Sequence, residues 1–190
     1  MIGRVLFSLS ALALVAAQPA AELPPAPMLP IIAPQEVAND PSNRLTLDLS
    51  TGGRVVIVLR PDAAPGHVER ITSLVRNGFY NGLVFHRVVP GFMAQGGDPK
   101  GTGEGGSTLP DLKAEFNSLP FLRGTMGAAR ADSPDSANSQ FFIMFAPNAS
   151  LNDKYTVMGR VIEGMDAVDK IAPGEPPEQP TRIVRASLGG

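Results

Sequence analysis

The alternation of apolar and polar positions predicts short strands along most of the chain. Leu45, Leu47 and Leu49 alternate with polar residues, and a turn at Thr51-Gly52-Gly53 leads into the apolar run Val55–Leu59. A period of two is typical of a half-buried strand, and a Gly-containing turn between two such stretches favours a β-hairpin. Further short apolar stretches, separated by Gly and Pro, predict strands at Leu83–Val89, Phe92–Gln95, Gly124–Ala129, Gln140–Phe145, Thr156–Val161 and Arg182–Leu188.

Two segments follow helical spacing instead. Apolar residues recur every three or four positions from Val68 to Val75, Pro65 suits the first turn of a helix, and Asn77-Gly78 provides a stop. A second, shorter pattern lies around Met165–Ile171. Many short strands with only two helices favour a β-sandwich or a closed β-barrel.

The first 43 residues differ in character from the rest. Arg4 precedes an apolar run that ends in Val15-Ala16-Ala17, which is the layout of a secretory signal peptide over residues 1–17. A transmembrane anchor is the alternative, but the run is shorter than the roughly 20 residues that a membrane span needs. Residues 18–43 are rich in proline and predict an extended, mostly disordered tether, so the folded domain is expected over 44–190.

Composition narrows the classes of function. The 190 residues contain no Cys, which excludes thiol catalysis and thiolate metal sites, and the two His make a poor metal site. A formal net charge of -2 provides no basic surface for nucleic acid. We therefore expect no metal, no cofactor and no nucleic-acid partner, and a monomer that is not inserted in the membrane once the signal peptide is cleaved.

Three motifs occur in order along the expected domain: Phe85-His-Arg-Val-Val-Pro-Gly-Phe-Met-Ala-Gln-Gly-Gly-Asp98, Asn138-Ser-Gln-Phe-Phe-Ile143 and Leu151-Asn-Asp-Lys-Tyr-Thr-Val-Met-Gly-Arg-Val161. Together they resemble the cyclophilin family over roughly residues 44–188. The resemblance implies a mainly β fold, an eight-stranded antiparallel closed β-barrel capped by two α-helices, and peptidyl-prolyl cis/trans isomerase activity. It also implies a set of site residues, with Arg87 as the catalytic residue and a substrate-binding group of Phe92, Met93, Gln95, Ala129, Arg130, Gln140, Phe142, Leu151 and Tyr155.

Arg87 suits this chemistry on physical grounds. Rotation about an X–Pro bond meets a barrier of about 18–20 kcal/mol, which amide resonance sets. A permanently charged planar donor can hydrogen-bond the imide nitrogen more strongly when the bond is twisted, and such differential binding lowers the barrier. His86 is expected to make a structural hydrogen bond, because isomerisation transfers no proton.

Three positions depart from the best-known eukaryotic members of that family. Ser150 stands where those proteins have Trp, Tyr155 where they have His, and Arg130 where they have Asn. Ser150 lacks the hydrogen bond and the apolar cover of an indole. Weak binding of the cyclic peptide cyclosporin is therefore expected, with near-normal isomerase activity.

Two functions remain open at this point. The first is an isomerase that acts on exported, folding polypeptides, most simply in the periplasm, where the uncatalysed step takes tens to hundreds of seconds. The second is a chaperone or scaffold that binds proline-containing segments in the same groove without catalysis. A further alternative is that the tether positions the domain at a membrane or in an assembly.

Overall fold

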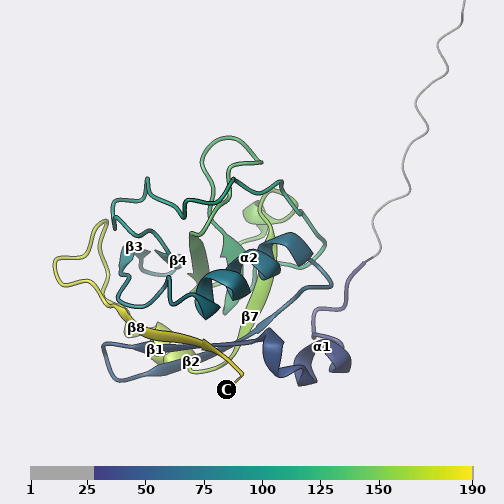
Figure 1. The fold of residues 1–190 in the computed structure, drawn as a ribbon, viewed down its shortest axis with the longest axis horizontal. Coiled ribbons are helices and arrows are strands. Elements are labelled where there is room, and N and C mark those ends of the chain that lie inside the picture. Colours follow the sequence, from purple (N-terminus) through teal and green to yellow (C-terminus); the bar gives the residue numbers. More distant parts are fainter. Residues whose placement is uncertain (1–27, 190) are drawn as a thin grey trace, which may run out of the picture.

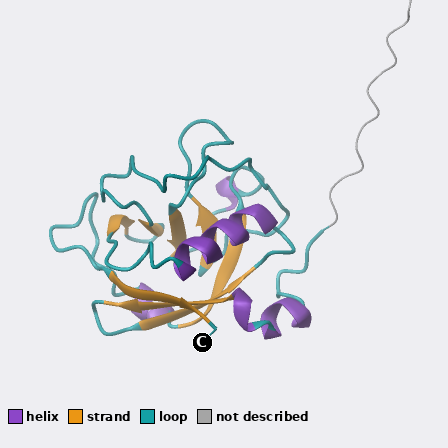
Figure 2. Ribbon diagram, in the orientation of Figure 1, coloured by secondary structure: helices purple, strands orange, loops and turns teal. Residues whose placement is uncertain are grey.

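A curved antiparallel sheet of eight strands forms the body of the protein in a computed structural model that describes residues 28–189 (Figures 1 and 2). All eight predicted strands and both predicted helices are present. The signal peptide and the tether residues 18–27 lie outside the described residues. The strands are β1 (Arg44–Leu49), β2 (Arg54–Leu59), β3 (Phe85–Val89), β4 (Met93–Gly96), β5 (Thr125–Ala128), β6 (Phe141–Met144), β7 (Val157–Glu163) and β8 (Ile183–Leu188); the helices are α1 (Gln35–Asn39), α2 (Pro65–Arg76) and α3 (Met165–Val168), with 3₁₀ turns η1 (Pro41–Asn43) and η2 (Ala149–Leu151).

The sheet is less closed than the sequence led us to expect. Its strand order is β3-β4-β6-β5-β7-β2-β1-β8, and the two end strands approach each other only at the isolated bridge between Val84 and Arg182. Beyond that bridge the outer edge of β3 is occupied by a loop, because Val88 pairs with Gly174 instead of with β8. The expected closed barrel is therefore overstated, and the sheet forms a half-barrel.

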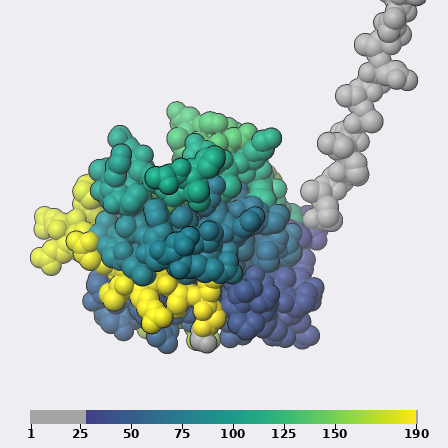
Figure 3. All heavy atoms as spheres, in the orientation of Figure 1, coloured from purple at the N-terminus to yellow at the C-terminus, as the bar shows by residue number. Residues whose placement is uncertain are grey.

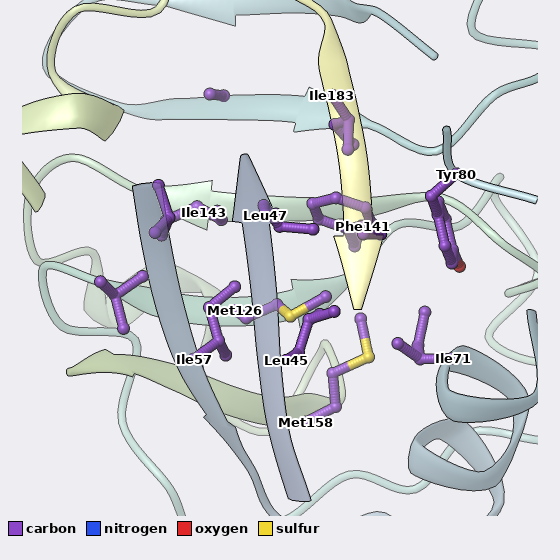
Figure 4. Packing of buried hydrophobic residues seen from close by; sticks show 14 of the residues in the cluster. Leu45, Leu47, Ile57, Ile71, Tyr80, Met126, Phe141, Ile143, Met158 and Ile183 are labelled. Atoms are coloured by element: carbon purple, nitrogen blue, oxygen red, sulfur yellow. The ribbon is translucent and has the colours of Figure 1, made fainter. Parts of the chain in front are cut away.

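The concave side of the sheet holds the main core (Figure 4). Leu45 and Leu47 of β1, Ile57 of β2 and Met126 of β5 are each at most 1% exposed. The helix α2 packs the apolar face predicted for it, including Ile71, against this core. The half-barrel is thus filled by side chains.

Residues 28–43 differ from the extended, mostly disordered segment expected there. They form α1 and η1, and α1 packs against β2. Val56 and Val58 of β2 are buried but do not belong to the main core cluster, so their face of the sheet needs cover of its own. The continuous apolar run of β2 is the sequence feature that reflects this burial on both faces. Figure 3 shows the segment as part of one continuous surface with the domain.

Arg60 fastens the start of this segment to the sheet. Its guanidinium is almost fully buried, pairs with Asp62, and donates to the carbonyl of Pro30 at 3.0 Å. The backbone N–H of Leu29 donates to the Ser118 hydroxyl at 2.8 Å. None of the helices in residues 28–189 combines the length and the hydrophobicity of a membrane span.

Candidate active site

Strand register places the first group of site residues in one row across the outer face of the sheet. Arg87 of β3 pairs directly with Gln95 of β4, and Gln95 pairs with Phe142 of β6. Phe142 in turn pairs with Gly127 of β5. Met93 lies two residues from Gln95 and therefore points to the same face. Residues far apart in the sequence thus meet because their strands are neighbours.

A tight turn between β3 and β4 sets this register. The Phe92 N–H donates to the Val89 carbonyl at 3.0 Å, and Gly91 has φ +72°. Pro90 followed by a residue with positive φ is the arrangement of a type II turn, which favours Pro and Gly at these positions. The turn brings Phe92 to the end of the row, where its ring packs against the apolar cluster of the outer face.

That apolar cluster, which we call the outer cluster, forms the floor of the site. Phe121 and Phe142 stack with ring centroids 5.7 Å apart, and the ring of Tyr155 meets both edge-on. Gly127 provides the room for this stack, because a Cβ there would lie 2.5 Å from Phe142 Cζ and 2.7 Å from Phe121 Cε1. The outer cluster consists of Met93, Leu119, Phe121, Ala129, Phe142, Met144 and Val157, with Leu29, Ala63, Val89, Phe92, Leu151 and Tyr155 packed against it.

A pocket of about 290 Å³ opens above this floor. All the predicted site residues except Gln140 line it: Arg87, Phe92, Met93, Gln95, Ala129, Arg130, Phe142, Leu151 and Tyr155. Gln140 lies in an adjoining pocket of about 500 Å³, which shares Gln95, Ala129 and Arg130 with the first. Ser150 lines neither pocket, and its hydroxyl donates to Asn148 Oδ1 at 2.7 Å.

Gln95 and Gln140 are linked to each other and to a glycine-rich loop. Gln95 Nε2 donates to Gln140 Oε1 at 2.9 Å, and Gln140 Nε2 donates to the carbonyls of Gly103 and Gly105 at 2.8 Å. Asp98 holds the same loop by accepting backbone N–H groups, among them that of Gly103 at 2.7 Å. Burial raises the pKa of Asp98, but these hydrogen bonds outweigh it and keep that pKa below its usual value.

Arg130 and Tyr155, two of the three variant positions, are in direct contact. The guanidinium of Arg130 lies over the Tyr155 ring, 4.5 Å from its centroid. Its terminal nitrogens donate to the carbonyls of Ala131, Asp132 and Lys154. The guanidinium is therefore fixed as the wall between the two pockets, stacked on an aromatic face in a cation–π arrangement.

His86 does not make the expected structural hydrogen bond. The ring is 5% exposed, and neither ring nitrogen has a hydrogen-bond partner among residues 28–189. Burial lowers the pKa of His86; the Asp98 carboxylate opposes this and the Arg87 guanidinium adds to it. The side chain is packed beneath the glycine-rich loop, close to Gly103.

Two residues at the site were missed from the sequence. Phe121 lies in a segment without periodicity, so no pattern identified it as part of the floor. Glu175 lies 88 positions from Arg87, yet its carboxylate accepts a hydrogen bond from Arg87 Nε at 2.6 Å. A Glu in a proline-rich loop carries no sequence signal for such a contact.

Comparison with known proteins identifies the family. Residues 46–188 match the model of the cyclophilin type peptidyl-prolyl cis-trans isomerases. A probable peptidyl-prolyl cis-trans isomerase from Brucella suis is 52% identical over 167 residues, covering 80% of this chain and 85% of the relative. Peptidyl-prolyl cis-trans isomerase B from Bacillus subtilis is 40% identical over 129 residues, covering 67% and 89%.

Solved structures agree with this family. A cyclophilin from Hirschia baltica superimposes with a TM-score of 0.73 at 30% identity, covering 78% of this chain and 74% of that one. A cyclophilin type isomerase from Cryptosporidium parvum, solved in the presence of the dipeptide Ala-Pro, gives 0.71 at 25% identity, covering 77% and 99%. With its family match, its relatives and its fold in agreement, the chain belongs to the cyclophilin-type peptidyl-prolyl cis-trans isomerases.

Proposed function

We propose that the pocket of about 290 Å³ receives the proline ring of an X–Pro segment and that Arg87 stabilises the twisted imide. The observation that carries this proposal is that Arg87 lines the same pocket as the apolar side chains of the outer cluster, which form its floor. Apolar walls with a few convergent polar groups are typical of a small-ligand site. The dipeptide Ala-Pro used with the Cryptosporidium parvum relative supports a proline-containing peptide as the substrate.

Rotation of the imide needs no proton transfer and no covalent intermediate. The chain must hold the ring, allow the preceding carbonyl to turn, and stabilise the state in which the nitrogen has regained its lone pair. The Arg87 Nη groups donate to no residue in the described part of the chain, so they are available for that nitrogen. A hydrogen bond that is stronger in the twisted state than in the planar state lowers the barrier, whereas a hydrogen bond of equal strength in both states does not.

Gln95 and the backbone around Ala129 are suited to hold the peptide beside the ring. Both lie where the two pockets join, so a peptide that leaves the proline pocket passes them. The link from Gln95 to Gln140 fixes the orientation of the Gln95 amide and leaves its carbonyl oxygen free to accept from a peptide N–H. Preorganised contacts of this kind reduce the entropy lost on binding.

We also propose that the protein acts as a monomer on polypeptides exported to the periplasm. The charged start and short apolar run of residues 1–17 support export, and the small residues at 15–17 support cleavage there. Amino-terminal sequencing of the protein recovered from a periplasmic fraction should begin near Gln18. Recovery in the membrane fraction with residues 1–17 intact would contradict this, and light scattering of the purified protein tests the monomer.

Exchange spectroscopy on an X–Pro peptide tests the enzymatic role of the site. The wild-type chain should accelerate cis/trans exchange at substoichiometric concentration, and Arg87→Ala should lose most of the acceleration while the peptide still binds. A binding module would instead form the complex with no change in exchange rate. Undiminished exchange in Arg87→Ala would refute the role assigned to Arg87.

A further inference from the structure

The catalytic arginine has a carboxylate partner that comes from the other end of the domain. Arg87 Nε donates to Glu175 Oε2 at 2.6 Å, and the two side chains are 42% and 52% exposed. No other acidic residue in the described part of the chain pairs with Arg87. The contact engages the inner nitrogen of the guanidinium and leaves the two outer nitrogens without a partner in residues 28–189, and Arg87 lines the pocket.

The backbone around Glu175 is fastened to the strand that carries Arg87. Val88 N–H donates to the Gly174 carbonyl at 2.8 Å, and Gly174 N–H donates to the Val88 carbonyl at 2.9 Å. Gly174 has φ +143°, and a Cβ there would lie 2.5 Å from Pro177 Cα, so only glycine fits. Glu175 directly follows this clamped residue as Val88 directly follows Arg87, so the main chain holds the two side chains beside each other.

Fixing the guanidinium matters because an exposed arginine is otherwise mobile. Its side chain carries about 2 kcal/mol of rotamer entropy, part of which is lost when it must adopt one orientation in the transition state. A carboxylate on Nε restricts the plane of the guanidinium before substrate arrives. We propose that Glu175 is a positioning residue that orients Arg87 for the twisted imide; this rests on the proposed role of Arg87.

The Glu175 carboxylate also has an electrostatic effect on Arg87 that acts in the opposite direction. A carboxylate 2.6 Å from Nε also reduces the field of the guanidinium at the imide nitrogen. If that effect dominated, removal of Glu175 would accelerate isomerisation. If Glu175 orients Arg87, its removal should instead lower kcat with little change in KM. The reason is that Arg87 acts on the twisted state and not on the bound ground state.

The experiment measures kcat and KM for an X–Pro peptide with Glu175→Ala and Glu175→Gln, each in the wild-type and the Arg87→Ala background. The expected result is a fall in kcat of about threefold for Glu175→Ala, since an exposed ion pair contributes at most about 1 kcal/mol. Glu175→Gln should recover at least half of that loss, because the amide oxygen still accepts from Nε. In the Arg87→Ala background Glu175→Ala should change nothing.

A matched control is Asp48→Asn, which removes another ion pair of similar length, with Arg54 on the β1–β2 hairpin, and should leave kcat unchanged. The proposal is overturned by an unchanged or higher kcat in Glu175→Ala, by failure of Glu175→Gln to recover activity, or by the same loss in the Arg87→Ala background. Wild-type activity in Arg87→Ala alone would instead refute the proposed function of the site, so the two failures are separable.

Discussion

Gly127 tests whether the stacked floor controls the pocket. In Gly127→Ala the new Cβ would lie 2.5 Å from Phe142 Cζ and 2.7 Å from Phe121 Cε1. Carbon atoms prefer separations of about 3.5–4.0 Å, so both rings must move by about 1 Å. Both rings are almost fully buried, and Phe142 lines the pocket, so this displacement changes the shape of the site.

The expected loss of stability follows from overpacking of the outer cluster. One extra methyl in a well-packed region typically destabilises by about 1–3 kcal/mol. For a domain of this size each kcal/mol lowers Tm by about 2–4 °C. We expect Gly127→Ala to unfold at a correspondingly lower temperature, and kcat/KM for an X–Pro peptide to fall about tenfold, since 1.4 kcal/mol of lost transition-state binding corresponds to that factor.

Calorimetry and peptide isomerisation at a temperature well below Tm measure the two effects separately. The matched variant is Gly127→Ala combined with Phe121→Leu, which removes the contact with the Phe121 ring and leaves space into which Phe142 can shift away from the methyl. Activity should recover in this double variant more than stability does, because loss of the stack itself costs free energy. Wild-type Tm and activity in Gly127→Ala alone would refute the reasoning.

Three further outcomes are expected. Arg60→Ala should lower the free energy of unfolding in urea by about 2 kcal/mol or more, because it leaves the partly buried Asp62 carboxylate without its partner; an unchanged midpoint would show that the N-terminal segment contributes little. Burial raises the pKa of Glu115, but hydrogen bonds from His67 and from backbone N–H groups outweigh it and lower that pKa in the folded state. The stabilisation is therefore complete above about pH 4.5 and is lost as the pH falls through the folded pKa, so Glu115→Gln should flatten the acid limb of a stability–pH profile. Ser150→Trp should strengthen the weak cyclosporin binding expected of the wild type without a comparable change in isomerase activity, and a nanomolar dissociation constant for the wild type would contradict this expectation.

Secondary structure in this chain follows largely from local pattern. The leucines of β1 alternate because one face of that strand is buried, and the apolar face of α2 recurs at helical spacing for the same reason. The turn at Pro90-Gly91 determines how β3 and β4 pair, which in turn places Arg87 opposite Gln95. Much of the site was predictable because the motifs that carry its residues resemble those of the cyclophilin family, whereas the pairing that brings their strands together was not read from local pattern.

Local sequence pattern was not sufficient to predict where the ordered part of the chain begins. Prolines between positions 19 and 41 predicted an extended segment, but α1 packs against β2 and Val37 is buried. Whether a short, weakly helical segment is ordered depends on the apolar surface available to it. That surface is the second face of β2, and its presence becomes apparent only once the sheet has formed.

The sequence by itself determined the strands and the two main helices, because each depends on spacing within a few positions, and the motifs that resemble the cyclophilin family identified the site residues from Arg87 to Phe142. Only the tertiary structure decided that the sheet stays a half-barrel, that Phe121 supports Phe142, and that Glu175 contacts Arg87. The contact of Glu175 with Arg87 joins residues 88 positions apart through the loop that covers the edge of β3. Contacts of that kind depend on how the elements pack in space, and no periodicity along the chain encodes them.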